Sequence, residues 1–287
     1  MSGPEIQHLI ENDLHRAVSR HAAPPQPDPV RATPWVAMSL MQKAIRRGRK
    51  DLALRAAATL LQDAPDRLWR RIGCIASEDI GLGSLDAVGL ATAALAGKRL
   101  RMELGGDWAV ASCVIGELAR ARECRAADDL LMACELLPAH AGARAELRGL
   151  TMRQLTVIAS GSGPVHERAL ALCYALGGGP RSFGLTRRRG EAGPVFDHLW
   201  GAGWPYSILE IARMGYARTG EVLSPFVALL SRELTEPVRV EPDALPPEIM
   251  IGDTPGWTYD LFSREGRAVS HGSFNPMPHR RYGCAVT

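Results

Sequence analysis

Apolar residues recur at helical spacing along most of the chain. Leu68, Ile72 and Ile75 fall at i, i+4 and i+7, which places them on one stripe of a helix over residues 66–80. Residues 5–21 carry a shorter amphipathic pattern of the same kind. The same periodicity, with capping residues and short turns between the segments, predicts further helices over residues 35–48, 51–62, 84–96, 108–122, 126–137, 144–159 and 164–176. We therefore expect an all-α fold, built as a compact array of antiparallel helix pairs.

Changes in composition along the chain predict four parts. Five prolines between residues 24 and 34 disfavour a helix and suit an extended linker. The glycines at 177–179 mark a second change, and helix signals become few after Pro237. The predicted parts are an N-terminal helix and linker (1–34), a helical domain (35–176), further helices (177–236) and a loop-rich C-terminal tail (237–287).

The tail contains three segments whose patterns suggest short strands, at residues 238–240, 257–261 and 267–269. It also interleaves aromatic with basic side chains, a composition that suits stacking on nucleic-acid bases as well as packing over the helical body. Packing is the interpretation that we favour for Trp257, Tyr259 and Phe262. Both interpretations stay open for the last dozen residues.

The overall composition is that of an ordinary globular protein. The chain has 287 residues, of which 46% are hydrophobic, and this is enough for one large core or two smaller ones. No apolar run reaches the roughly 18 residues that a membrane span needs, and the N-terminus lacks a signal-peptide profile, so we expect a cytoplasmic protein without membrane contact. The six cysteines form no C-x-x-C pair, and we expect neither a metal site nor another cofactor.

Positive charge is concentrated near the N-terminal third of the chain. Residues 31–73 hold ten Lys or Arg against three acids, an excess of seven, whereas the whole chain carries only +3. Such an excess attracts phosphate backbones, because neutralised phosphates release counterions. The alternative is pairing with acids inside the fold or plain solvation. The candidate DNA-binding residues are Arg46, Arg47, Arg49, Lys50 and Arg70.

Several short motifs in this region resemble one protein family. They are Gln-Lys-Ala-Ile-Arg at 42–46, an alanine-rich helix at 54–61, Arg-Arg-Ile at 70–72 and Ala-Ser-Glu-Asp-Ile-Gly-Leu at 76–82. Together they resemble the C-terminal helical region of clamp-loader-like AAA+ ATPases of the replication-associated recombination protein A (MgsA) type. The resemblance covers about residues 35–137. Ala44 stands where the family has Ser, and the family's later Lys-Ser-Asn element has no counterpart here.

The resemblance implies a helical domain akin to the clamp-loader collar, which mediates tetramer formation in that family beside a DNA-handling ATPase ring. The sequence contains no G-x-x-x-x-G-K-[S/T] phosphate loop, so ATP hydrolysis by that mechanism is not expected. We therefore expect a non-enzymatic assembly or adaptor protein linked to DNA replication, recombination or repair. Its expected partners are a second copy of itself, an AAA+ ATPase or DNA.

Two adjacent carboxylates, Glu78 and Asp79, lie near the end of the predicted 66–80 helix, where the helix dipole disfavours negative charge. Basic side chains must compensate them, and the nearest sources are Lys43, Arg46 and Arg71. We expect a structural ion-pair network of these residues. A catalytic pair is a weaker interpretation, because no His or Cys lies nearby at metal-ligand spacing.

A second class of function stays open from the sequence. An enzyme of unknown reaction would place its site in residues 140–287, outside the region of resemblance. A cluster of candidates around one concave pocket would favour an enzyme, whereas an exposed apolar face on the 35–137 helices would favour assembly. The candidates are Glu191, Asp197, His198, Glu210 and Asp260.

Overall fold

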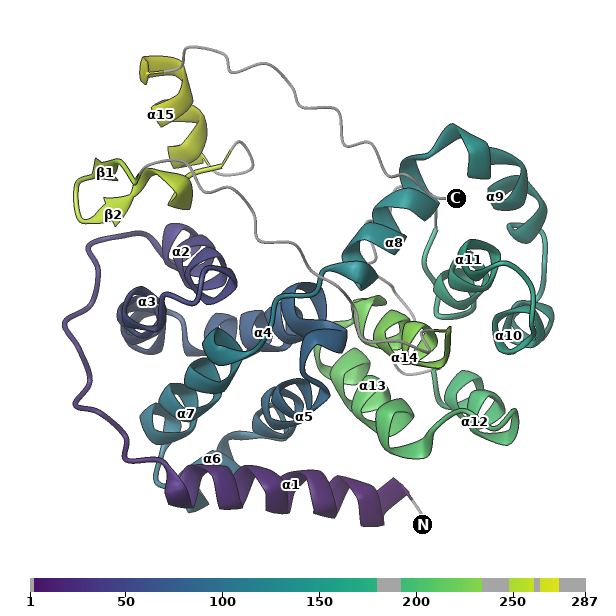
Figure 1. Cartoon of the computed structure of the whole chain (residues 1–287), viewed down its shortest axis with the longest axis horizontal. Helices are drawn as coiled ribbons and strands as arrows, with labels where there is room; N and C mark the ends of the chain where they lie inside the picture. The colour runs from purple at the N-terminus through teal and green to yellow at the C-terminus, as the bar shows by residue number, and fades with distance from the viewer. Residues whose placement is uncertain (1–2, 180–191, 234–247, 261–263, 274–287) are drawn as a thin grey trace.

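The computed structural model describes residues 3–179, 192–233, 248–260 and 264–273 (Figure 1). Within these residues it contains fifteen α-helices and one antiparallel pair of two-residue strands. The predicted all-α fold is therefore confirmed. None of the described helices combines the length and the apolar composition that a bilayer span requires.

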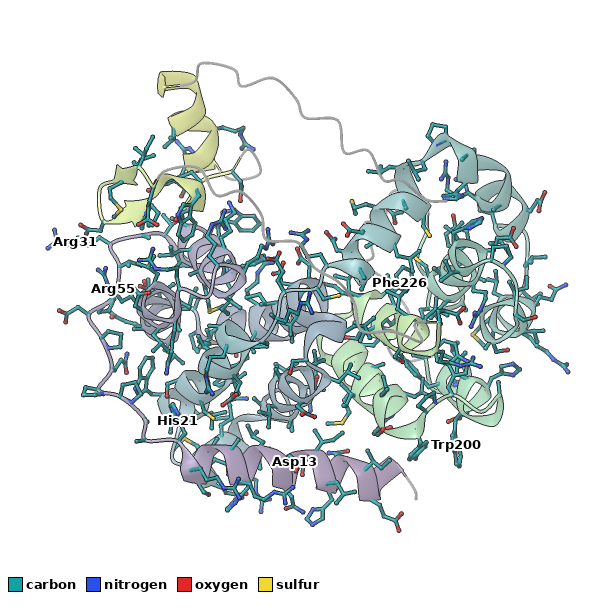
Figure 2. The ribbon with its side chains drawn as sticks, viewed as in Figure 1. Asp13, His21, Arg31, Arg55, Trp200 and Phe226 are labelled. Atoms are coloured by element: carbon teal, nitrogen blue, oxygen red, sulfur yellow. The ribbon has the colours of Figure 1, made fainter. Side chains whose placement is uncertain are left out.

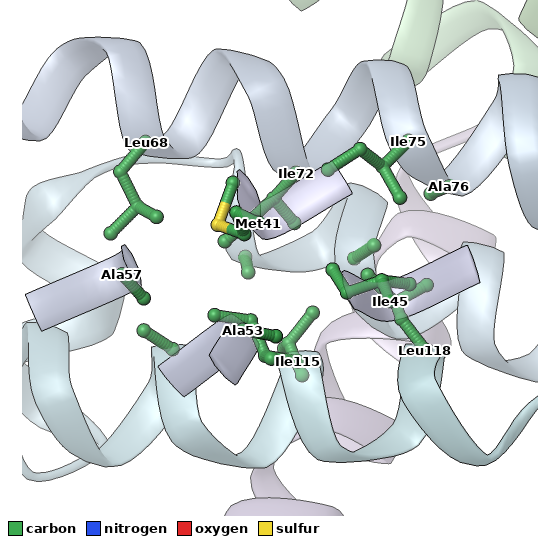
Figure 3. Packing of buried hydrophobic residues seen from close by; sticks show 14 of the residues in the cluster. Met41, Ile45, Ala53, Ala57, Leu68, Ile72, Ile75, Ala76, Ile115 and Leu118 are labelled. Atoms are coloured by element: carbon green, nitrogen blue, oxygen red, sulfur yellow. The ribbon is translucent and has the colours of Figure 1, made fainter. Parts of the chain in front are cut away.

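Seven helices surround the first of two hydrophobic cores. In the close view of Figure 3, Met41 and Ile45 from α2 meet Ile72 from α4 and Ile115 from α7. All four side chains are at most 2% exposed. The helices of this first lobe are α1 (Gly3–Arg20), α2 (Pro34–Arg46), α3 (Lys50–Asp63), α4 (Pro65–Ile75), α5 (Leu85–Ala94), α6 (Lys98–Glu103) and α7 (Asp107–Arg120).

The next seven helices surround a second core, in which Phe226, labelled in Figure 2, and Tyr216 are almost completely buried. Tyr216 also donates a hydrogen bond of 2.9 Å to the carbonyl of Leu176. The helices of this second lobe are α8 (Ala126–Leu136), α9 (Ala141–Leu147), α10 (Met152–Ser160), α11 (Val165–Ala175), α12 (Gly193–Gly201), α13 (Tyr206–Thr219) and α14 (Leu223–Glu233). In the sequence, the last buried residue of the first core is Leu118 and the first buried residue of the second core is Ala127. The boundary expected at residue 176 does not coincide with this division.

Helix α1 is part of the body, although a proline-containing segment separates it from α2. Ile6, Ile10 and Leu14 are buried in the first core, and the helix lies across α5, α7 and α13 (Figure 1). The segment that follows is itself anchored, since the carbonyl of Pro24 accepts a hydrogen bond from the Trp108 indole and the amide of Val30 donates one to a side chain of α3. The N-terminal helix thus packs on both lobes.

The junction between the lobes begins with a change of helix type. Helix α4 ends at Ile75, a π-helical turn follows over Ala76–Ile80, and a 3-10 turn covers Gly81–Gly83. The α-helix predicted over residues 66–80 is therefore wrong in its last turn. Gly81 has φ +44°, a conformation that favours glycine, and this stops the helix. π-Helical turns are rare and are found frequently at functional sites.

The described tail contains no strand at either position predicted there. Residues 256–258 form a 3-10 turn and helix α15 spans Arg264–Ser273, so the strands predicted at 257–261 and 267–269 are wrong. The observed strands are β1 (Met250–Ile251) and β2 (Thr254–Pro255), and the strand predicted at 238–240 lies outside the described residues. The tail lies on α2, although the two segments are more than 200 residues apart in the sequence (Figure 1).

Gly83 supplies a test of the junction, because a Cβ atom there would lie 2.0 Å from the carbonyl oxygen of Arg122. The carbonyl belongs to the backbone and the Cβ is fixed to it, so neither can rotate away and Gly83→Ala must push the two segments apart. We expect a loss of about 1–3 kcal/mol in the free energy of unfolding, measured by chemical denaturation. The control is Gly142→Ala in α9, where the added Cβ meets no atom within 4 Å. That change should be neutral or stabilising, and equal destabilisation by both would contradict the proposed close approach.

Candidate functional site

Asp79 is the centre of the junction. Its side chain is completely buried, and a buried carboxylate is tolerated only when hydrogen bonds and opposite charge compensate it. Arg46 donates from Nε to Oδ1 at 2.9 Å and its Nη2 lies 2.6 Å from the same oxygen, while the Gln42 amide donates to Oδ2 at 2.9 Å. The expected pairing of Asp79 with Arg46 is therefore present. It fastens the π-helical turn to α2.

A second arginine reaches the same carboxylate from the other lobe. Arg125, immediately before α8, places Nη1 3.6 Å from Oδ1 of Asp79 and also pairs with Asp128 in the first turn of α8. The backbone of the same residue makes a further contact, since the amide of Cys124 donates a hydrogen bond of 2.8 Å to the carbonyl of Asp79. One residue thus connects α2, the π-helical turn and the start of α8.

Negative charge exceeds positive charge around this centre. Glu78 lies 3.9 Å from the nearest nitrogens of both Arg46 and Arg125, which is too far for a hydrogen bond. Burial, the neighbouring Asp79 and then Asp128 raise the pKa of Glu78 to about 7. Burial also raises the pKa of Asp79, although Arg46 and Arg125 oppose that shift. Glu78 is therefore the weakly compensated member of the pair.

Two members of the expected network have other partners. Lys43 does not pair with either carboxylate: its Nζ lies 3.2 Å from Oδ2 of Asp260 and 3.1 Å from the carbonyl of Thr258. Arg71 takes part only indirectly, by donating to Oε1 of Gln42 at 3.1 Å. Sequence reasoning missed Gln42 and Arg125. Arg125 opens a helix of the other lobe, and only the tertiary fold brings it to Asp79.

We call residues 248–260 the C-terminal strap, because they cross the outer face of α2. Ser39 donates to the carbonyl of Thr258 at 2.6 Å, beside the Lys43 contacts just described. The guanidinium of Arg47 lies over the Trp257 ring, 4.7 Å from its centroid. Arg49, after α2, forms an ion pair of 3.0 Å with Glu248. The packing interpretation of Trp257 is therefore correct.

The strap changes the interpretation of the candidate DNA-binding residues. Arg46 points to the buried Asp79, and the strap covers Arg47 and Arg49. Lys50 is half-buried beside α7, where its Cε would lie 3.3 Å from a Cβ at Gly116. Arg70 is exposed, yet it donates to the carbonyl of Thr219 at 3.2 Å. The five side chains do not form one open cationic surface while the strap is docked.

The structure separates the candidates for an enzyme site. Asp260 belongs to the strap and contacts Lys43 of α2. Glu210 is buried in α13 and accepts hydrogen bonds from Arg213 on the same helix. Asp197 and His198 are exposed on α12, where Nε2 of His198 is 3.2 Å from the Ser160 hydroxyl. Glu191 lies outside the described residues. A cavity of about 290 Å³ beside α10 and α11 has none of the four described candidates in its lining.

In the part of the chain that the structure describes, no three His, Cys, Asp or Glu side chains are grouped so that they could hold a metal ion. Comparison of the chain with protein-family models, curated proteins and solved structures finds no match. The resemblance to the collar region of the AAA+ ATPases is therefore carried by the motifs of the sequence alone, and the function that it implies is a proposal.

Removal of the central carboxylate should weaken the fold. Asp79→Ala leaves Arg46 half-buried with only distant carboxylates, and losing one member of a buried pair costs roughly 3 kcal/mol of unfolding free energy. Chemical denaturation measures this loss. The control is Glu103→Ala, because the exposed Glu103 pairs only with an exposed arginine one turn away. An unchanged stability of Asp79→Ala would rule out the ion-pair account of the junction.

Glu78 should behave in the opposite way, with a distinct pH dependence. Its pKa is near the ordinary glutamate value of 4.5 in the unfolded chain and about 7 in the fold, so the folded state binds more protons between these values. Stability contributed by this group therefore falls as the pH rises from about 4.5 to 7. Glu78→Gln removes the ionised form and should stabilise the protein by roughly 1–3 kcal/mol at pH 8.

At pH 5 the same variant should have nearly wild-type stability, because Glu78 is then mostly protonated in the folded protein. Thermal melts at both values of pH measure the difference. Glu103→Gln is the matched control, since it makes the same chemical change at an exposed position. Destabilisation by Glu78→Gln at pH 8 would show that Glu78 stabilises the fold as a carboxylate.

Proposed function

We propose that the chain is a non-enzymatic assembly or adaptor protein linked to DNA replication, recombination or repair, with a second copy of itself, an AAA+ ATPase or DNA as its partner. The link to DNA transactions comes from the resemblance of residues 35–137. The observation that carries a binding role is the docking of the strap on α2. There a 3-10 turn of the tail and the residues after it are recognised through a carboxylate, a main-chain carbonyl and an aromatic ring.

The residues that carry the resemblance support this proposal through their positions. Ala76–Ile80 is the π-helical turn, and its Asp79 holds Gln42 and Arg46 of α2. The same helix presents Ser39, Lys43 and neighbouring residues to the strap. A buried network therefore fixes one side of α2 while its other side makes contacts. Such a rigid support reduces the entropic cost of recognition by the outer face.

Exposed tryptophans supply a test of assembly. Trp35, at the start of α2, is 44% exposed within the region of resemblance, and Trp200 on α12 is 51% exposed outside it. Tryptophan is enriched among residues that dominate interface energetics. If residues 35–137 mediate assembly, Trp35→Ala should weaken self-association or ATPase binding at least tenfold, whereas Trp200→Ala should leave both unchanged.

The measurement is light scattering of the purified full chain across a concentration series, together with affinity purification from the native cell and mass spectrometry. Supporting results are an oligomer, or co-purification of an AAA+ ATPase of replication or repair, that depends on Trp35. A monomer at every concentration that retains no replication, recombination or repair protein would contradict the proposal. Equal loss in both variants would place the contact elsewhere.

A further inference from the structure

The contacts of the strap match, group by group, those that a single nucleic-acid strand makes with a protein. Two carboxylates, of Asp260 and Glu248, meet the cations of Lys43 and Arg49 at 3.2 and 3.0 Å. Phosphate oxygens are the other common partners of such cations. Between these pairs, the planar bicyclic ring of Trp257 stacks on the guanidinium of Arg47, as a base stacks on arginine.

The face under the strap would carry an excess of cations without it. Removal of the two carboxylates would leave Lys43, Arg47 and Arg49 at the end of α2, with Asp51 still paired to Arg49, and the exposed Arg31 lies at the same side of the molecule (Figure 2). The burial of Lys43 beneath the strap lowers its pKa, and the nearby carboxylate of Asp260 only partly offsets this effect. Uncovering the face would therefore also favour the charged form of Lys43.

The start of the strap is docked only shallowly. The side chains of the Arg49–Glu248 pair are 41% and 38% exposed, and ion pairs in such positions contribute only about 0–1 kcal/mol each. Ile249 and Met250 on the outer side of the strap are 71% and 53% exposed. The rest of the strap is more deeply placed, because Trp257 packs against the first core. The strap is thus held both by this packing and by polar groups on α2, and a polyanion could engage those polar groups in its place.

We propose that the C-terminal strap is an internal mimic of a single nucleic-acid strand, which covers a binding face of Lys43, Arg47 and Arg49 and yields it to a competing strand. This inference deepens the proposed function and rests on its identification of α2 as the recognition surface. It names single-stranded nucleic acid as the ligand and the strap as its competitor. Acidic protein segments are the rival occupants, and the experiment separates the two.

The experiment measures binding of a fluorescent single-stranded oligodeoxythymidylate of about 20 nucleotides to the full chain by anisotropy. Glu248→Gln combined with Asp260→Asn removes the two charges of the strap. We expect this released variant to bind at least tenfold more tightly than the wild type at low salt. Affinity should fall steeply with added salt, because phosphate contacts release counterions.

Three controls define the result. Glu103→Gln with Glu146→Gln makes the same change in net charge on exposed residues of α6 and α9 and should give no comparable gain. Adding Arg47→Gln and Arg49→Gln to the released variant should abolish the gain and flatten the salt dependence. A synthetic peptide of residues 248–260 should compete with the oligonucleotide on the released variant. Hydrogen exchange of the strap amides should rise in that variant.

The proposal is overturned if the released variant gains no affinity, or if the charge-matched control gains as much. Binding of the peptide but not of the oligonucleotide would overturn it in favour of an acidic protein partner. Failure of the assembly proposal would give a different result: the chain would neither self-associate nor retain a partner through Trp35. A monomeric chain with a strap-controlled face would support the present inference and contradict only assembly.

Discussion

The buried carboxylate of Asp79 is the interaction on which the architecture depends. Its side chain binds α2, its backbone carbonyl binds the segment that leads into α8, and Arg125 completes the connection from the second lobe. A charge in this position is tolerated because two arginines and an amide surround it. The same crowding leaves Glu78 insufficiently compensated, which is why burial and like charge raise its pKa. Stability and pH sensitivity therefore come from one cluster.

Helix α2 has a different environment on each side. Its inner side carries Met41 and Ile45 into the first core and Arg46 to Asp79, while its outer side meets the strap. Because the inner contacts fix the rotation of the helix about its axis, they also fix which side chains reach the strap. The basic segment noted in the sequence thus has two kinds of contact: Arg46 compensates the buried Asp79, whereas Arg47 and Arg49 contact the strap.

The sequence predicts the elements of this fold better than their assembly. Helical periodicity identifies most helices, since a buried stripe such as Leu68, Ile72 and Ile75 has a direct signature in the chain. It does not distinguish the π-helical turn from the α-helix before it, because both present the same composition. The pairing of Asp79 with Arg46 could be predicted, because a buried carboxylate needs a cation. The pairing of Lys43 with Asp260 could not, because only the tertiary fold brings together two residues that are 217 positions apart.

Helix α1 connects the start of the chain to both lobes, and this has a consequence for synthesis. Its apolar stripe packs on α5 and α7 and also on α13, which begins at Tyr206. In a chain emerging from the ribosome, the part of that stripe that packs on α13 stays uncovered until most of the second lobe has been made, because contacts between distant segments form only after both exist. Helix α1 is therefore made well before α13 and completes its contacts only after α13 has been added.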